Sequence, residues 1–281
     1  MLKSEKITLA RELVTEAQTK KGEQPATMAR RLKVNPAIFT HLFKENADEL
    51  LSDEMLLKII NDLRPKMLFK KVDTANHATI QNICKEAKRK HRFVCILGYP
   101  GAGKTAGLDH YNRHNGNVWV IECNSVMNRK QFFGEILSKM GINFKRGSLY
   151  DMIAAIITEL NQKENPLLIF DEASKLRQTI LLDLHYLRNA TMQNAGIILA
   201  GVDYFYENLL KAAQRDKEGI PELLSRLQAK YTLEPPTKAE ITEICKANGV
   251  TDEQTIKEFV RIKNFRELSN AILNETDESL S

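Results

Sequence analysis

The segment from Gly98 to Thr105 has the residue types that bind a polyphosphate. An apolar run, Phe93 to Leu97, precedes it, and a helix-permissive stretch follows it. A strand that enters a glycine-rich turn and then a helix directs backbone N–H groups and the helix N-terminus at one point. This is the Walker A pattern, in which Lys104 is predicted to reach the β- and γ-phosphates. The predicted nucleotide contacts are Gly98, Pro100, Gly101, Ala102, Gly103, Lys104, Thr105 and Ala106.

A second apolar run, starting at Leu167, ends in two carboxylates, Asp171 and Glu172. This is a Walker B pattern, and the sequence between it and Lys104 has room for two helices and a strand. Thr105 and Asp171 are the predicted Mg²⁺ ligands, the latter through water, while Glu172 would orient or deprotonate the attacking water. The adjacent acids favour hydrolysis over transfer to a substrate hydroxyl. The predicted enzyme is an ATPase with ATP and Mg²⁺ as cofactors.

Composition limits the other classes of protein. The chain has 281 residues, 43% of them hydrophobic, enough for an α/β core with one or two small helical units. No run approaches the roughly 18 apolar residues of a membrane span, and the first residues do not resemble a signal peptide, so a cytoplasmic location without membrane partners is expected. Four scattered cysteines favour neither a zinc knuckle nor a disulfide framework. His110 and His114 have ligand spacing but no evident third ligand.

The net charge is a modest +5, but the basic residues are clustered. Such clusters permit contacts with the nucleic-acid backbone, although a solvated helix face is the alternative interpretation. The tail from Glu275 to Ser281 is acidic. The basic clusters are Lys85 to Arg92, Arg129-Lys130 and Lys145-Arg146.

Residues 1–65 are predicted to form an all-α domain with a helix-turn-helix. Two helical segments, Gln24 to Leu32 and Pro36 to Phe43, are separated by a three-residue turn that ends in Asn35. Ala29 lets the helices approach, and Asn35 before a proline is a cap signal. This pattern places Thr40, His41 and Lys44 toward a DNA groove. A hairpin used only for packing or assembly is the alternative.

The remaining sequence predicts two further domains. Arg64-Pro65-Lys66 is the expected linker, because the residue before a proline is disfavoured in a helix. Residues 66–235 alternate between apolar runs and helical periodicity, which predicts a parallel sheet covered by helices. Residues 236–281 are wholly helical in pattern and predict a three-helix lid. The expected strands are Phe93 to Leu97, Val118 to Glu122, Leu167 to Phe170, Ile197 to Ala200 and Tyr231 to Leu233.

Together these motifs resemble the AAA+ ATPases, and among them the phage Mu-type target-selection ATPases. The segments that carry the likeness are the phosphate loop, His114 to Ile121 and Ile169 to Ala173. The resemblance implies an AAA+ P-loop core with a C-terminal lid and an N-terminal helix-turn-helix domain. It also implies an arginine finger at Arg226, acting in trans on a neighbouring subunit, and a nucleotide contact from Arg266 of the lid.

One position departs from that family. Mu-type proteins place Gly-Asn at the end of the fourth strand, whereas this chain reads Gly201-Val202-Asp203. Either Asp203 substitutes for the amide, or γ-phosphate sensing is weakened; the sequence leaves both open.

The resemblance further implies ATP-dependent self-assembly on double-stranded DNA, with little sequence preference, and delivery of that DNA to a transposase. The residues expected to face the duplex are Arg129, Lys130, Lys145 and Arg146. Lysine and arginine bind phosphate without reading bases, which suits sequence-tolerant binding.

Three alternatives remain open from the sequence. A helicase loader or initiator has similar motifs. A regulator with an operator-binding helix-turn-helix, in which ATP changes only the oligomeric state, would tolerate slow hydrolysis. A small-molecule kinase is the weakest alternative because of the lid placement and the Asp171-Glu172 pair.

Overall fold

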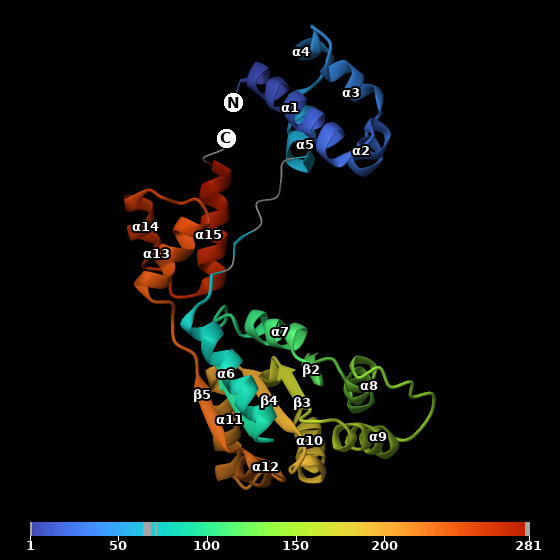
Figure 1. Cartoon of the computed structure of the whole chain (residues 1–281), viewed down its shortest axis with the longest axis vertical. Helices are drawn as coiled ribbons and strands as arrows, with labels where there is room; N and C mark the ends of the chain where they lie inside the picture. The colour runs from blue at the N-terminus through green and yellow to red at the C-terminus, as the bar shows by residue number, and fades with distance from the viewer. Residues whose placement is uncertain (1, 64–68, 71, 279–281) are drawn as a thin grey trace. The chain divides into compact units, whose positions relative to one another are not determined.

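A computed structural model describes residues 2–63, 69–70 and 72–278 of the chain. The chain divides into two compact units, one containing the N-terminal helices and the other spanning Lys70–Thr276 (Figure 1). Each unit is described by itself. The predicted linker Arg64-Pro65-Lys66 and the last three residues of the acidic tail lie outside the described residues. The domain limits expected from the sequence stay a prediction.

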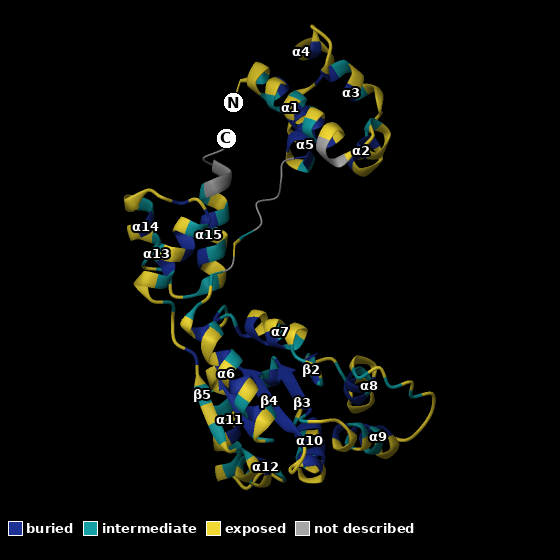
Figure 2. Ribbon diagram, viewed as in Figure 1, coloured by how far each residue is buried: buried dark blue, intermediate teal, exposed yellow. Residues whose placement is uncertain are grey.

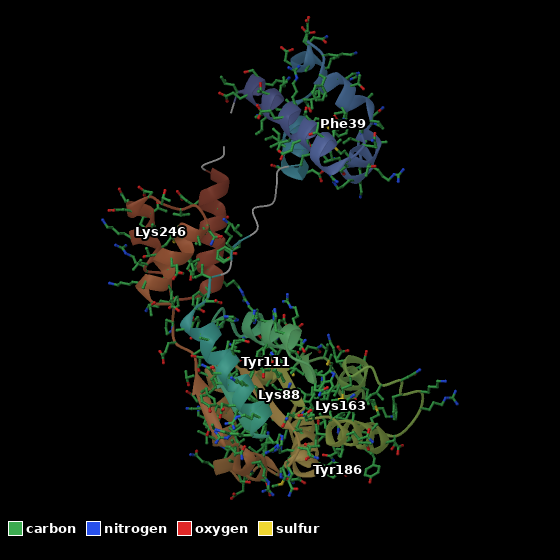
Figure 3. The ribbon with its side chains drawn as sticks, in the orientation of Figure 1. Phe39, Lys88, Tyr111, Lys163, Tyr186 and Lys246 are labelled. Carbon is green, nitrogen blue, oxygen red and sulfur yellow. The ribbon has the colours of Figure 1, made fainter. Side chains whose placement is uncertain are left out.

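The N-terminal unit is all-α and has its own apolar core. Phe39 and Leu42 from one helix pack in this core with Met28, Leu56 and residues of the first helix (Figures 2 and 3). The periodic apolar positions of the sequence account for this burial, because each short helix hides a single face. The helices are α1 (Lys3–Lys21), α2 (Pro25–Leu32), α3 (Ala37–Leu42), α4 (Ala47–Leu50) and α5 (Asp53–Leu63).

A tight turn joins α2 to α3. Lys33 ends α2 in the left-handed region at φ 53°, and the Val34 N–H donates to the Ala29 carbonyl. The Asn35 side chain accepts a hydrogen bond from the Ala37 N–H at 2.9 Å, which starts α3. Arg31 forms ion pairs with Glu23 and Asp62. The structure thus has two short helices at the expected positions, and their assignment as a DNA-reading helix-turn-helix stays a prediction.

The second unit is built on a five-stranded parallel sheet in the order β2-β3-β4-β1-β5. The three central strands are buried along their whole length, as expected for a parallel sheet covered on both faces (Figure 2). The α/β fold class predicted from the sequence is confirmed. The strands are β1 (Phe93–Leu97), β2 (Val118–Glu122), β3 (Leu167–Asp171), β4 (Gly196–Gly201) and β5 (Ala229–Thr232).

Helices cover both faces of this sheet. Alternate residues of β1 separate the two apolar clusters: Val94 and Ile96 pack with α6 (Ala75–Arg89) and α7 (Lys104–His114), where Tyr111 is also buried (Figure 3). Phe93, Cys95 and Leu97 belong to the cluster of the opposite face. The helices of that face are α8 (Arg129–Lys139), α9 (Leu149–Gln162), α10 (Gln178–Thr191), α11 (Asp203–Gln214) and α12 (Ile220–Arg226), and η1 (Ala173–Lys175) follows β3.

A helical lid follows β5. It consists of α13 (Lys238–Ala247), α14 (Glu253–Phe259) and α15 (Phe265–Glu278). The buried Asn248 ties the lid to the segment before α6: its side chain accepts from the Lys70 N–H at 2.7 Å and donates to the Lys70 carbonyl at 3.0 Å. The Glu240 carboxylate accepts a second hydrogen bond, from the Ala75 N–H. The segment that enters the core and the lid that leaves it are therefore joined directly.

Candidate functional site

The phosphate loop lies between β1 and α7, at the carboxyl edge of the sheet. Its first residue, Gly98, donates its N–H to the Gly201 carbonyl at 3.2 Å, which fixes the start of the loop beside the end of β4. Gly101 and Gly103 have φ angles of +86° and +84°, a region that disfavours residues with a Cβ atom. Helix α7 begins directly after Gly103, so its first N–H groups, which have no intrahelical acceptor, face the loop.

Lys104 is held inside the loop. Its side chain is buried, and its ammonium donates to the Gly98 carbonyl at 2.6 Å and to the Tyr99 carbonyl at 3.2 Å. Burial lowers the pKa of Lys104, and the nearby Asp171 carboxylate acts in the opposite direction. Carbonyl oxygens fill the hydrogen-bonding positions of this buried ammonium but do not neutralise its charge. The ammonium therefore still favours binding an anion.

The carboxylates expected from the sequence meet α7 at this edge. The Thr105 hydroxyl donates to the Asp171 carboxylate at 2.6 Å. Asp171 is 1% exposed, and burial raises its pKa while the hydrogen bond from Thr105 opposes that shift. Glu172 follows in the left-handed region at φ 55°, with its N–H donating to the other Asp171 oxygen at 2.9 Å. The Glu172 side chain is about one-third exposed and lies 3.7 Å from the Lys175 ammonium.

The lid contacts the phosphate loop at Gly101, which the sequence alone did not indicate. The Phe265 N–H donates to the Gly101 carbonyl at 3.1 Å, so the start of α15 rests on the loop. A Cβ atom at Gly101 would lie 2.9 Å from the Asn264 side chain and 3.2 Å from the Cβ of Arg266. Asn264 also accepts from the Glu267 N–H, as a helix cap does. The Asn264-x-x-Glu267 spacing was the signal that could have located this helix start.

Arg266 belongs to the same site, whereas Arg226 does not. Arg266 lies close enough to Lys104 to contribute to lowering its pKa. Arg226 ends α12, just before β5 begins, and therefore lies at the amino edge of the parallel sheet. There its charge adds to the effect of burial in lowering the pKa of Arg188, whose guanidinium is buried and donates to the carbonyls of Ala195 and His91. Arg226 cannot reach the phosphate loop of its own chain from that edge.

The four basic residues predicted to face DNA have different surroundings. Arg129, at the start of α8, forms a two-pronged ion pair with Asp183 of α10, with distances of 2.6 and 2.5 Å. This hydrogen bonding raises the pKa of Arg129. Lys130 is exposed beside it, while Lys145 and Arg146 are exposed in the loop between α8 and α9. The 11-residue helix α8, about 16 Å long, begins with the first pair and leads to the loop that carries the second.

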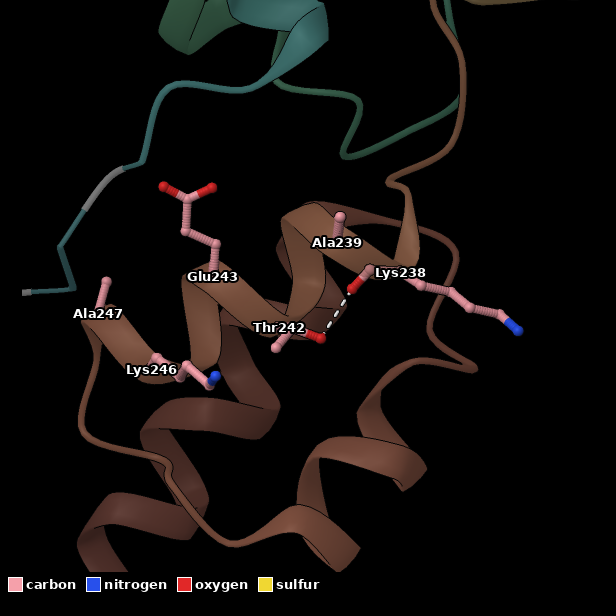
Figure 4. Close-up of a pocket in the computed structure, with 6 residues that line it drawn as sticks. All are labelled: Lys238, Ala239, Thr242, Glu243, Lys246 and Ala247. Carbon is pink, nitrogen blue, oxygen red and sulfur yellow. Dashed lines mark hydrogen bonds between the residues drawn. The ribbon is translucent and has the colours of Figure 1, made fainter.

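The donors and acceptors at the carboxyl edge fit a Mg²⁺-nucleotide. Lys104 offers a positive charge to phosphate oxygens, and the first N–H groups of α7 offer hydrogen-bond donors. The Thr105 hydroxyl and the Asp171 carboxylate are hard oxygen ligands of the kind that Mg²⁺ takes. A shallow hollow on the outer face of α13 offers no comparable set (Figure 4); there the Thr242 hydroxyl donates to the Lys238 carbonyl at 2.9 Å, beside Ala239, Glu243, Lys246 and Ala247.

Three histidines lie together on the outer face of α6 and α7. His110 stacks on His114, with ring centroids 4.2 Å apart, and contacts His77 of α6 edge to face. Within residues 2–63, 69–70 and 72–278, no group of three or more His, Cys, Asp or Glu side chains is arranged to hold a metal ion. All four cysteines are buried. None of the helices in the described ranges is long and apolar enough to cross a bilayer.

Comparison with known proteins agrees with this geometry. Residues 87–209 match the AAA domain family. The chain is 25% identical over 191 residues to the Mu-like prophage FluMu DNA transposition protein B of Haemophilus influenzae, covering 66% of this chain and 64% of that protein. Among solved structures, the Orc1 protein of Aeropyrum pernix in complex with DNA is similar, with a TM-score of 0.54 and 17% identity over 78% of this chain and 63% of that one.

Residues 87–209 thus match an AAA domain, and the predictions of an ATPase and of a resemblance to Mu-type transposition proteins are confirmed. The chain aligns with slightly less than two thirds of both relatives' own lengths. The likeness to the archaeal protein concerns the fold alone. The roles of individual site residues stay predictions.

Proposed function

We propose that this chain is an ATP-dependent, largely sequence-nonspecific double-stranded DNA-binding ATPase, which assembles on target DNA and delivers it to a transposase. The observation that carries the proposal is the divided site. Lys104, Thr105, Asp171 and Glu172 meet at the carboxyl edge of the sheet, whereas Arg226 is exposed at the amino edge. The similarity to a Mu-like DNA transposition protein B supports the choice of substrate and partner.

Each residue at the carboxyl edge has a defined task. Lys104 and the N–H groups of α7 would hold the phosphates, and Thr105 and Asp171 would hold the metal. Bound Mg²⁺ would neutralise charge on the phosphate oxygens. Glu172, the more exposed of the two acids, accepts the proton of the attacking water or orients it. Arg266 adds positive charge from the lid, which the hydrogen bond from the Phe265 N–H to the Gly101 carbonyl holds against the phosphate loop.

Arg226 completes the site of a neighbouring subunit. An arginine contributed in trans stabilises the charge that develops on the transferred phosphoryl group, so hydrolysis depends on assembly. Within one subunit the geometry permits no cis role for Arg226, since it lies at the opposite edge of the sheet. A homo-oligomer is therefore the proposed functional form.

Lys130, Lys145 and Arg146 are the proposed DNA contacts, since all three are exposed. Arg129 was predicted with them, but its pairing with Asp183 means that any phosphate must compete with a carboxylate already in place. We therefore assign Arg129 mainly to holding α8 against α10. Contacts made by lysine and arginine with phosphate are salt-sensitive and tolerate any sequence.

The assignment is tested with a triple variant in which Lys130, Lys145 and Arg146 are changed to alanine. Its affinity for random-sequence duplex DNA should fall at least about tenfold at a fixed salt concentration, with ATP binding unchanged. The matched control changes three exposed lysines elsewhere to alanine: Lys211, Lys238 and Lys246. Equal DNA affinity for the two triple variants would remove these residues from the interface.

Two other functions predict different results. If the chain were a helicase loader or initiator, a pull-down with it as bait would recover a replicative helicase and not a transposase. A nucleotide-switched regulator would protect one palindromic operator in footprinting, whereas an assembly on target DNA would protect continuous stretches. The proposed location is the cytoplasm of a bacterial or phage-infected cell.

A further inference from the structure

Asp203 follows the strand that lies between the two halves of the nucleotide site. It is the first residue of α11, two residues beyond the end of β4, and β4 lies between β3 and β1 in the sheet. The two flanking strands lead into the Asp171-Glu172 pair and into the phosphate loop. Gly201, at the end of β4, also accepts the Gly98 N–H. An exposed carboxylate thus follows the central strand at the point where both motifs converge.

The charges around this point are unbalanced. Three carboxylates, those of Asp171, Glu172 and Asp203, act on the Lys104 ammonium strongly enough to oppose the effect of burial on its pKa. Asp171 is buried and bonded to Thr105, and Glu172 pairs with Lys175. Asp203 is exposed, and the structure gives it no side-chain hydrogen bond or ion pair among the described residues. Its charge is therefore the one most free to act on a ligand.

We propose that the Asp203 carboxylate faces the γ-phosphate position and selectively lowers the affinity of an isolated subunit for ATP relative to ADP. The inference rests on the proposed nucleotide site and deepens it. A like charge beside the terminal phosphate opposes triphosphate binding, whereas a diphosphate does not reach it. A carboxylate, unlike an amide, has no N–H group that could donate a hydrogen bond to a phosphate oxygen.

Assembly would relieve this penalty. A neighbouring subunit that contributes Arg226 would bring a positive charge to the γ-phosphate and offset part of the repulsion from Asp203. The triphosphate is then bound more tightly in the oligomer than in the free subunit, and by linkage ATP favours assembly by the same factor. Asp203 would thereby make ATP binding and self-association more strongly coupled than a neutral residue would.

The test compares nucleotide binding by the full-length chain and an Asp203→Asn variant. Isothermal titration calorimetry measures the dissociation constants of Mg²⁺-AMP-PNP, which is not turned over, and Mg²⁺-ADP, at a protein concentration that keeps the chain monomeric. Asp203→Asn should tighten AMP-PNP binding on the order of tenfold and leave ADP within about twofold. The control, Glu207→Gln, removes the same charge one turn further along α11 and should change neither constant.

Equal changes for the two nucleotides, no change for either, or weaker AMP-PNP binding would overturn the role of Asp203. A wild-type chain that binds neither nucleotide would instead overturn the proposed function. An Asp203→Ala variant guards against misfolding of the asparagine variant and should shift AMP-PNP binding in the same direction. In the asparagine variant, addition of duplex DNA should increase AMP-PNP affinity by a smaller factor than in the wild type.

Discussion

Because Arg129 pairs with Asp183, a substitution at position 129 is expected to change the stability of the fold as well as any contact with DNA. Asp183 has a side chain only 10% exposed, and Arg129 supplies both of its strong hydrogen bonds across α8 and α10. Arg129→Ala should lower the free energy of unfolding by about 1–2 kcal/mol, because a nearly buried carboxylate loses its partner. Lys130→Ala, at the neighbouring exposed position, should change it by less than about 0.5 kcal/mol. Urea unfolding monitored by circular dichroism measures both.

The comparison has its own internal check. Adding Asp183→Asn to the Arg129→Ala variant removes the unpaired charge and should recover part of the lost stability. If Arg129→Ala and Lys130→Ala were equally stable, the ion pair would have no structural role, and Arg129 would return to the set of free DNA contacts.

Glu172 and Asp171 are adjacent in sequence but are expected to do different work. Glu172→Gln should reduce the rate of ATP hydrolysis by about 10²–10⁴-fold, because an amide cannot take the proton of the attacking water. Nucleotide affinity should stay within about twofold, since Asp171 and Thr105 still hold the metal. The control is Glu122→Gln, at the end of β2, in register with Asp171 on the neighbouring strand. A Glu172→Gln variant with the wild-type rate would exclude Glu172 as the base.

At the level of elements, the close approach of α6 to β4 depends on a single glycine. A Cβ atom at Gly196 would lie 2.4 Å from the Ala87 carbonyl oxygen, a backbone atom that cannot rotate away. Gly196→Ala should therefore cost more than about 2 kcal/mol of stability or prevent folding. Gly134→Ala in α8 is the matched control: its Cβ atom would only touch the Met152 side chain at 3.6 Å, so its stability should stay equal or rise. Thermal unfolding of the two variants decides the question, and equal melting temperatures would contradict the packing described for α6.

The elements that position the site could be predicted because their signals are local. The apolar runs before Gly98 and before Asp171 define β1 and β3, and the turn chemistry of the phosphate loop defines the start of α7. The contact of Phe265 with Gly101 could not be predicted, because it joins residues far apart in the chain without complementary charge or a shared motif. The ion pair of Arg129 with Asp183 joins opposite charges, but its partner lies on another helix far along the chain and could not be chosen from the sequence among the other acidic residues.

The placement of Asp203 lies between these two cases. Its sequence position beside the fourth strand was clear, but only the strand order places it between the phosphate loop and Glu172. Single-sequence patterns do not give the order of strands in a sheet, so the resemblance could associate Asp203 with the terminal phosphate, but only the structure shows that β4 lies between the strands that carry the two motifs.

At the level of the whole molecule, the divided site predicts complementation between two inactive chains. Arg226→Ala should reduce hydrolysis by about 10³-fold or more when the finger acts in trans. A mixture with the Glu172→Gln chain should regain activity, because Arg226 of the latter completes the intact site of the former. Phosphate release measured as a function of the mixing ratio tests this, with Arg215→Ala as an exposed-arginine control. Failure to recover activity, or an Arg226→Ala chain with the wild-type rate, would contradict a trans-acting finger.

The most direct measurement is negative-stain microscopy of the chain on random-sequence duplex DNA with ATP, with ADP and without nucleotide. Continuous filaments are predicted with ATP alone, and they should persist with the Glu172→Gln chain, which binds ATP without turning it over. Bare DNA, or isolated particles at fixed sites under all three conditions, would contradict ATP-dependent assembly on target DNA.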